Sequence, residues 1–229
     1  MDVIIWNEAW WTIIHEAIGH WLEADLLNSS IYRDKLGKQV AATFVNIIDE
    51  PTRNGLRWSY NLDHEWVKSK KTYLIKDWVL VSYLHSNKTA DLFETESTWH
   101  ARREAYYCPT LVRMWNTYLD SWTSKKEEII SKIKNWIYVS QMWWWQVNTV
   151  TWDFVFKVSY GYLIKDWKLT DIIRWANISW NWPQMLQNIK AICDDLEHFD
   201  WWTCGKWQSM PVSDATPTIW VELKVTGVK

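Results

Sequence analysis

Two histidines and a glutamate near the start of the chain are the residues best suited to metal-assisted hydrolysis. His15, Glu16 and His20 form the pattern HExxxH. Neutral imidazoles bind zinc, and a carboxylate beside them can take a proton from an attacking water. Residues i and i+5 lie about 140° apart around a regular α-helix, so both imidazoles can share one metal only where the helix is distorted or ends. Gly19 lies where such a distortion costs least. From spacing alone, a helix with two unrelated histidines remains an alternative interpretation.

The segments that would position these residues indicate an α+β fold rich in strands. Some segments repeat apolar residues at helical spacing, whereas others are dominated by β-branched and aromatic residues. The expected helices are 13–27, 125–137 and 184–198, and the expected strands lie within 38–50, 72–85, 146–164 and 218–225. We therefore expect a mixed or antiparallel sheet, with the HExxxH segment on a helix near the N-terminus. Since no Pro-rich, Gly/Ser-rich or charged linker divides the chain, residues 1–229 are predicted to form one domain.

A short repeat predicts two hairpins. YLIKDWVL at 73–80 recurs as YLIKDWKL at 162–169, and each copy reads as two strands joined at Asp-Trp. A two-residue type I′ turn needs φ > 0 at both central residues, which suits Asp-Gly and not Asp-Trp. If Trp78 and Trp167 stand where glycine belongs, both segments become ordinary hairpins. By the same argument, the three tryptophans at 143–145 would form a flexible loop.

Composition narrows the class of protein. The net charge is −2, from 25 basic and 27 acidic residues, and gives no electrostatic footprint for nucleic acid or an anionic membrane. No signal peptide is evident, and no apolar stretch reaches the roughly 18 residues of a membrane helix. Cys108, Cys193 and Cys204 are sparse and lack CxxC spacing, which suits a reducing cytoplasm.

Seven blocks of sequence resemble the TldD/PmbA family of peptidases. HEAIGHWLEAD at 15–25 resembles the HEAIGHxLEAD segment of the family's metal-binding TldD branch. The resemblance continues, in order, at 36–41, 47–52, 62–86, 97–119, 151–169 and 201–219. It covers nearly the whole chain and implies the catalytic half of such a protein. Family members carry a further N-terminal domain of similar size, which we expect to be absent from this chain.

The resemblance implies a zinc site. In the family, the two histidines of HExxxH and a cysteine near the C-terminus bind the metal, which here implies His15, His20 and Cys204 as ligands of one Zn²⁺. Glu16 would be the general base of peptide hydrolysis. Without the family, a buried structural role for Cys204 would be the simpler interpretation. Glu23 and Asp25 could orient a histidine, although exposed helix charges are the simpler expectation.

The other polar residues receive no assigned role. Four histidines without partner spacing are expected to be structural or on the surface: His64, His85, His100 and His198. The charged and amide residues of the 97–119 block could fix substrate or pair with carboxylates: Arg102, Arg103, Arg113 and Asn116.

The resemblance also implies partners. Family members of this branch act on peptides or unfolded segments and pair with a homologous subunit, so a heterodimer or homodimer is expected. Two alternatives stay open: a non-catalytic subunit of such a dimer, and a Trp-rich binding module unrelated to the family. The PmbA-like branch lacks the HExxxH set, which argues against the first alternative.

The tryptophan content has one economical explanation. The chain has 23 Trp and 6 Gly, whereas about 7% Gly, roughly 16 residues, is average. Against the family's blocks, the tryptophans fall at glycine or turn positions. UGA encodes tryptophan in one variant genetic code and glycine in another. We therefore hypothesise that UGA glycine codons were translated as tryptophan.

Overall fold

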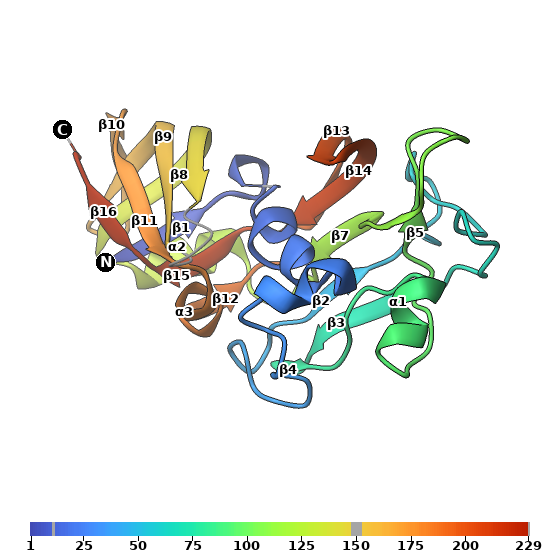
Figure 1. The fold of residues 1–229 in the computed structure, drawn as a ribbon. Helices are drawn as coiled ribbons and strands as arrows, with labels where there is room; N and C mark the ends of the chain where they lie inside the picture. Colours follow the sequence, from blue (N-terminus) through green and yellow to red (C-terminus); the bar gives the residue numbers. More distant parts are fainter. Residues whose placement is uncertain (11, 148–152, 229) are drawn as a thin grey trace.

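Two sheets and a central helical segment make up the molecule. The computed structural model describes residues 1–10, 12–147 and 153–228. The eight-stranded sheet lies on one side and the six-stranded sheet on the other, and the helical turns that carry HExxxH lie between them (Figure 1). The predicted α+β fold with mixed and antiparallel sheets is confirmed.

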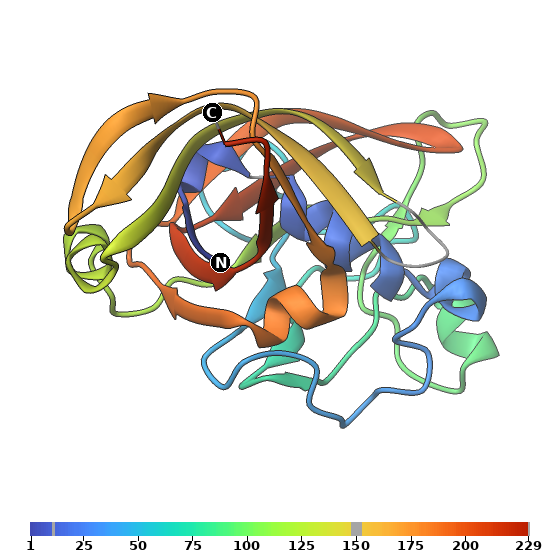
Figure 2. The same ribbon diagram turned by 90° about the vertical axis from the view of Figure 1, so that its left-hand side faces the viewer.

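The larger sheet has the order β12-β15-β1-β8-β9-β11-β16, with β10 paired to β9. Its strands are β1 (Asp2–Ile5), β8 (Asn135–Val147), β9 (Asp153–Lys165), β10 (Lys168–Ile173), β11 (Asn177–Asn181), β12 (Ile189–Ile192), β15 (Ile219–Glu222) and β16 (Lys224–Thr226). The long strands β8, β9 and β10 curve together across this sheet, and helix α2 (Lys126–Lys132) lies at one end of it (Figure 2). Only the β1–β8 pairing is parallel among the pairings described for this sheet.

The smaller sheet has the order β13-β14-β7-β2-β3-β4. Its strands are β2 (Ile47–Asp49), β3 (Thr72–Lys76), β4 (Val79–Leu80), β7 (Asn116–Leu119), β13 (Glu197–Lys206) and β14 (Gln208–Thr216). A two-stranded ribbon joins β5 (Ala101–Arg102) to β6 (Leu111–Val112), and helices α1 (Asn87–Leu92) and α3 (Trp182–Gln187) complete the regular α-helices of the described residues.

The main core joins both sheets to the HExxxH segment. Strand β1 is buried on both faces because successive side chains of a strand point to opposite sides. Val3 and Ile5 pack into the main core, whereas Ile4 packs with Ile129 of α2 and with Ile133, just after that helix, in a second, small core. Burial on two sides explains the uninterrupted apolar run at the start of the chain.

Both predicted hairpins are present. β3 and β4 are joined at Asp77 and Trp78, with φ of 46° and 65°, and β9 and β10 are joined at Asp166 and Trp167, with φ of 48° and 62°. Two successive positive φ values are the signature of the type I′ turn.

Several predicted elements were wrong in extent or type. Of 38–50, only β2 is a strand, and 184–198 holds α3 and then β12 instead of one helix. The helix expected at 125–137 ends at Lys132, and Ile137 belongs to β8. The loop expected at 143–145 is also part of β8, because its backbone pairs with β9. For the segments at 125–137, 143–145 and 184–198, pairing within a sheet overrode the local pattern, whereas most of 38–50 pairs with no strand.

Candidate metal centre

A π-helical turn solves the spacing problem of HExxxH. The segment consists of a π-turn η2 (His15–Gly19), then the 3₁₀ turns η3 (His20–Leu22) and η4 (Ala24–Ser29). The His20 N–H donates to the carbonyl of His15, five residues back, which is the hydrogen bond of a π-turn. This wider turn brings i and i+5 to the same side, so the predicted distortion before His20 is confirmed.

Gly19 allows the turn to pack closely. A Cβ atom at Gly19 would lie 1.8 Å from Sδ of Met114, a fully buried side chain. No larger residue fits at this position without displacing Met114, so the bend and the glycine are linked by packing.

Cys204 reaches the same point from strand β13. Its Sγ lies 3.1 Å from Nε2 of His20. One donor atom each of His15, His20 and Cys204 lie within 4.8 Å of one another, and the two imidazole rings are nearly perpendicular, with centroids 4.8 Å apart. Arg113 donates to the carbonyl of Cys204 at 2.9 Å and fixes the strand there. The three predicted ligands are thus brought together.

Each histidine is oriented by a buried carboxylate. Nδ1 of His15 lies 3.0 Å from Oδ1 of Asp214, and Nδ1 of His20 lies 2.8 Å from Oε2 of Glu23. Both Nε2 atoms therefore face the thiol, and Nε2 of His15 is buried with no hydrogen-bond partner in the described part of the chain. A buried, unpaired imidazole nitrogen beside a thiol is what a metal ligand set presents in the absence of its ion.

Glu23 was expected to be an exposed helix charge, and this expectation was wrong. Its side chain is fully buried, and it binds His20, Lys206 at 3.0 Å and Arg113 at 3.7 Å. Burial alone would raise its pKa, but His20 and the two cations lower it to about 2. Asp25 is partly exposed and accepts a hydrogen bond from Lys206 at 2.7 Å.

The thiol of Cys204 is poised to ionise. Its burial raises the pKa, but His15 and His20 beside it lower the pKa to about 6. Burial lowers the pKa of His20, but the charge of Glu23 and the thiol outweigh burial and raise it to about 9. Thiolates are the form of cysteine that binds metals, whereas the raised pKa of His20 favours an imidazolium, which must lose its proton before it can bind one.

Glu16 lies on the wall of a cavity at this centre. The cavity has a volume of about 310 Å³. It is lined by Glu16, His20, Trp21, Leu26, Trp202, Cys204, Gly205 and Lys206. Glu16 and two of the three donor residues, His20 and Cys204, thus border the same cavity.

Asp214 and Lys206 belong to the centre although no sequence pattern indicated them, whereas Arg113, for which pairing with a carboxylate was one expected role, pairs with Glu23. Asp214 lies on β14, 199 positions from its partner His15, so no spacing could connect them. The other four histidines do not reach the cluster: His100, for example, is buried against Asp49 at 3.2 Å, which fits the structural role expected for it.

The comparisons with known proteins identify the family. A sequence profile described as the PmbA/TldA metallopeptidase C-terminal domain matches residues 1–227. The chain belongs to this family. A metalloprotease of Methanocaldococcus jannaschii is 37% identical over 215 residues, which cover 93% of this chain and 47% of that protein. A metalloprotease TldD homolog of Buchnera aphidicola is 34% identical over 219 residues, which cover 94% of this chain and 45% of that protein.

The fold of the PmbA/TldA C-terminal domain is also found in a solved structure. TldE from Thermococcus kodakarensis superposes with a TM-score of 0.84 at 18% identity, covering 99% of this chain and 50% of that one. The chain spans about half the length of the relatives it matches. The predicted resemblance is confirmed, and the curated relatives are named metalloproteases, as expected of a metallopeptidase family. Among the described residues, no helix has the length and apolar character to cross a bilayer.

Proposed function

We propose that this chain is the metal-binding, catalytic part of a zinc-dependent peptidase that hydrolyses peptides or unfolded segments. The observation that carries the proposal is the convergence of His15, His20 and Cys204 within 4.8 Å. Two imidazole nitrogens and one thiolate suit zinc, and three protein ligands leave a position open, as catalytic zinc requires.

The chain's own residues have separate roles in this proposal. His15 and His20 would bind through Nε2, because Asp214 and Glu23 occupy their Nδ1 atoms. A bound zinc would supply a Lewis acid that lowers the pKa of a water and polarises the substrate carbonyl. Glu16 would accept the proton of the attacking water and pass it to the leaving amine.

The partners remain part of the proposal. We expect a homologous subunit beside this chain, because relatives of this family are named TldD and a neighbour of the same fold is named TldE. We also expect a cytoplasmic location, because the three cysteines are sparse and free. A Trp-rich binding module unrelated to the family does not agree with the family match over residues 1–227. The other alternative, a non-catalytic subunit, predicts that the three donors hold no metal.

Metal content and hydrolysis together test the proposal. We expect about one zinc per chain, lost in His15→Ala and in Cys204→Ala. Glu16→Ala keeps the zinc and loses peptide hydrolysis, because the base is not a ligand. Cys108→Ala is the matched control, since Cys108 is outside the cluster, and it keeps both. Full zinc content in Cys204→Ala would refute the ligand set.

A further inference from the structure

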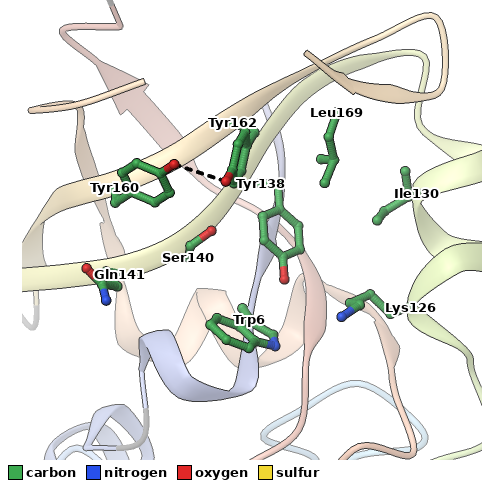
Figure 3. A pocket seen from close by; sticks show the side chains of 9 residues that line it. All are labelled: Trp6, Lys126, Ile130, Tyr138, Ser140, Gln141, Tyr160, Tyr162 and Leu169. Carbon is green, nitrogen blue, oxygen red and sulfur yellow. Dashed lines mark hydrogen bonds between the residues drawn. The ribbon is translucent and has the colours of Figure 1, made fainter. Parts of the chain in front are cut away.

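A second pocket lies on the larger sheet, on the face that α2 covers. Its volume is about 410 Å³ (Figure 3). It is lined by Trp6, Lys126, Ile130, Tyr138, Ser140, Gln141, Tyr160, Tyr162 and Leu169. None of these residues lines the cavity at the metal centre, so the two sites are separate.

Aromatic rings form much of the pocket wall. The Tyr160 and Tyr162 rings meet edge to face with centroids 5.3 Å apart, and their hydroxyls lie 3.0 Å from each other. The Tyr138 ring lies 6.4 Å from that of Tyr162. Such surfaces favour a flat ligand that can stack on one ring and meet the edge of another.

Two hydroxyl groups in this pocket have no protein partner. Tyr138 is 6% exposed and Ser140 is 7% exposed. Neither side chain makes a hydrogen bond to a described residue, and neither hydroxyl oxygen is fully buried, so both open onto the pocket. In Figure 3 the Tyr138 hydroxyl points toward the side where Trp6 and Lys126 lie. Burial raises the pKa of Tyr138, so its phenol stays protonated and can donate to a bound ligand.

The pocket lining carries one charged residue, Lys126, which makes no ion pair in the described part of the structure. Its Nζ lies 5.9 Å from the centroid of the Trp6 ring. Besides burial, the charges of Asp195 and Glu8 raise the pKa of Tyr138, but neither residue is part of the lining. Asp195 already accepts hydrogen bonds from Thr218. Lys126 is therefore the group in the lining that an anionic ligand would contact.

We propose that this pocket binds a carboxylic acid whose side chain ends in an aromatic ring. The ring stacks among Tyr138, Tyr160 and Tyr162, the carboxylate meets Lys126, and the free hydroxyls complete its hydrogen bonds. The proposal does not depend on Trp6, because the hydrogen-bonding groups and three of the four rings come from other residues. It also does not depend on zinc, since the two sites share no residue.

Calorimetric titration of the chain with four probes tests the proposal. The probes are N-acetylphenylalanine, its uncharged amide, a tetrapeptide that ends in phenylalanine, and maltose. We expect the acid to bind about tenfold more tightly than the amide, the effect of one charge-assisted hydrogen bond. Binding of the tetrapeptide at equal strength would identify a peptide C-terminus as the source of the ligand, and binding of the acid alone would identify a small molecule.

A pair of neighbouring lysines provides the control. Lys126→Gln weakens the binding of the acid about tenfold and leaves the binding of the amide unchanged. Lys125→Gln changes neither, because Lys125 pairs with Asp194 outside the pocket. Trp6→Gly keeps the binding. Equal affinity for acid and amide, preference for maltose, equal effects of both lysine variants, or no binding of any probe would overturn the proposal.

Discussion

At the scale of single residues, the candidate metal centre depends on the side chains that orient its ligands as much as on the ligands themselves. Asp214 from β14 orients His15, and Glu23 orients His20. Both carboxylates are fully buried, and Glu23 is balanced by Lys206 and Arg113. Partners of this kind fix the tautomer and raise the basicity of a metal-binding imidazole.

Asp214→Asn is expected to weaken zinc binding about 10- to 100-fold while the chain still folds. The asparagine amide has nearly the same shape as the carboxylate. It lacks the full negative charge that attracts the Nδ1 proton of His15. Competition with a chromophoric chelator measures the affinity. The control is Asp194→Asn, which changes an exposed carboxylate paired with Lys125. Equal affinities in the two variants would show that Asp214 does not act through His15.

The pKa of His198 predicts how the stability of the chain depends on pH. Burial, followed by the nearby Arg53, lowers the pKa of His198 to about 4, and neither ring nitrogen has a hydrogen-bond partner among the described residues. An unfolded histidine titrates near 6.5, so protonation favours unfolding. The contribution to stability is complete above pH 6.5 and is lost as the pH falls from 6.5 toward 4.

Urea unfolding at pH 7.5 and pH 5 checks this sign. His198→Gln removes the titrating group, so the variant should lose less stability between the two pH values than the parent chain. The difference is at most about 1.4 kcal/mol per pH unit and is reduced by the partial exposure of the ring. An identical loss in both proteins would mean that His198 titrates normally when folded.

The sequence could predict the ligand residues and not their supports. His15 and His20 are close in the chain, and Cys204 was connected to them through a recognisable family block. Glu23 was misjudged because its burial depends on Lys206, a residue 183 positions away. Long-range pairs of this kind leave no trace in local spacing.

At the scale of elements, the π-turn is the decisive feature. A regular helix would have pointed His15 and His20 about 140° apart, and the i→i+5 hydrogen bond removes that separation. The turn presses Gly19 against Met114, so a single methyl group should disturb it.

Gly19→Ala is expected to destabilise the chain by about 1–3 kcal/mol, the usual cost of overpacking. The added Cβ would lie 1.8 Å from Sδ of Met114. Because the clash is with that side chain, the cost of Gly19→Ala should be smaller in a Met114→Ala background. Gly205→Ala is the control, since its Cβ would meet no atom within 4 Å. Denaturant unfolding of the four variants measures the coupling, and an equal cost in both backgrounds would contradict the proposed clash.

Elements with a turn signal were predicted better than elements set by distant pairing. The two Asp-Trp hairpins were located because turn geometry is local. Helix α2 was predicted too long because Ile137 lies at helical spacing, yet it pairs with Val3 of β1 in the sheet. The sequence has no local signal that a strand at the N-terminus of the chain competes for this residue.

At the scale of the whole molecule, tryptophans are concentrated at an unfavourable backbone conformation. Six tryptophans have φ between 55° and 66°: Trp66, Trp78, Trp99, Trp167, Trp175 and Trp207. Left-handed backbone costs a side-chain-bearing residue roughly 1–2 kcal/mol, and glycine adopts it freely. The translation of UGA glycine codons as tryptophan is a hypothesis that the nucleotide sequence tests. UGG codons at these positions would refute it.

The backbone argument can be tested whatever the codons are. Trp66 and Trp143 are similarly exposed, at 81% and 77%, so neither is held by packing. Trp66 has a φ of 65°, whereas Trp143 lies in β8 with no positive φ. Trp66→Gly should therefore raise the free energy of unfolding by about 1 kcal/mol, and Trp143→Gly should lower it by about 0.5–1 kcal/mol, because glycine weakens a strand. Denaturant unfolding measures both changes. If the two substitutions shift stability in the same direction, the left-handed backbone is not what makes these tryptophans costly.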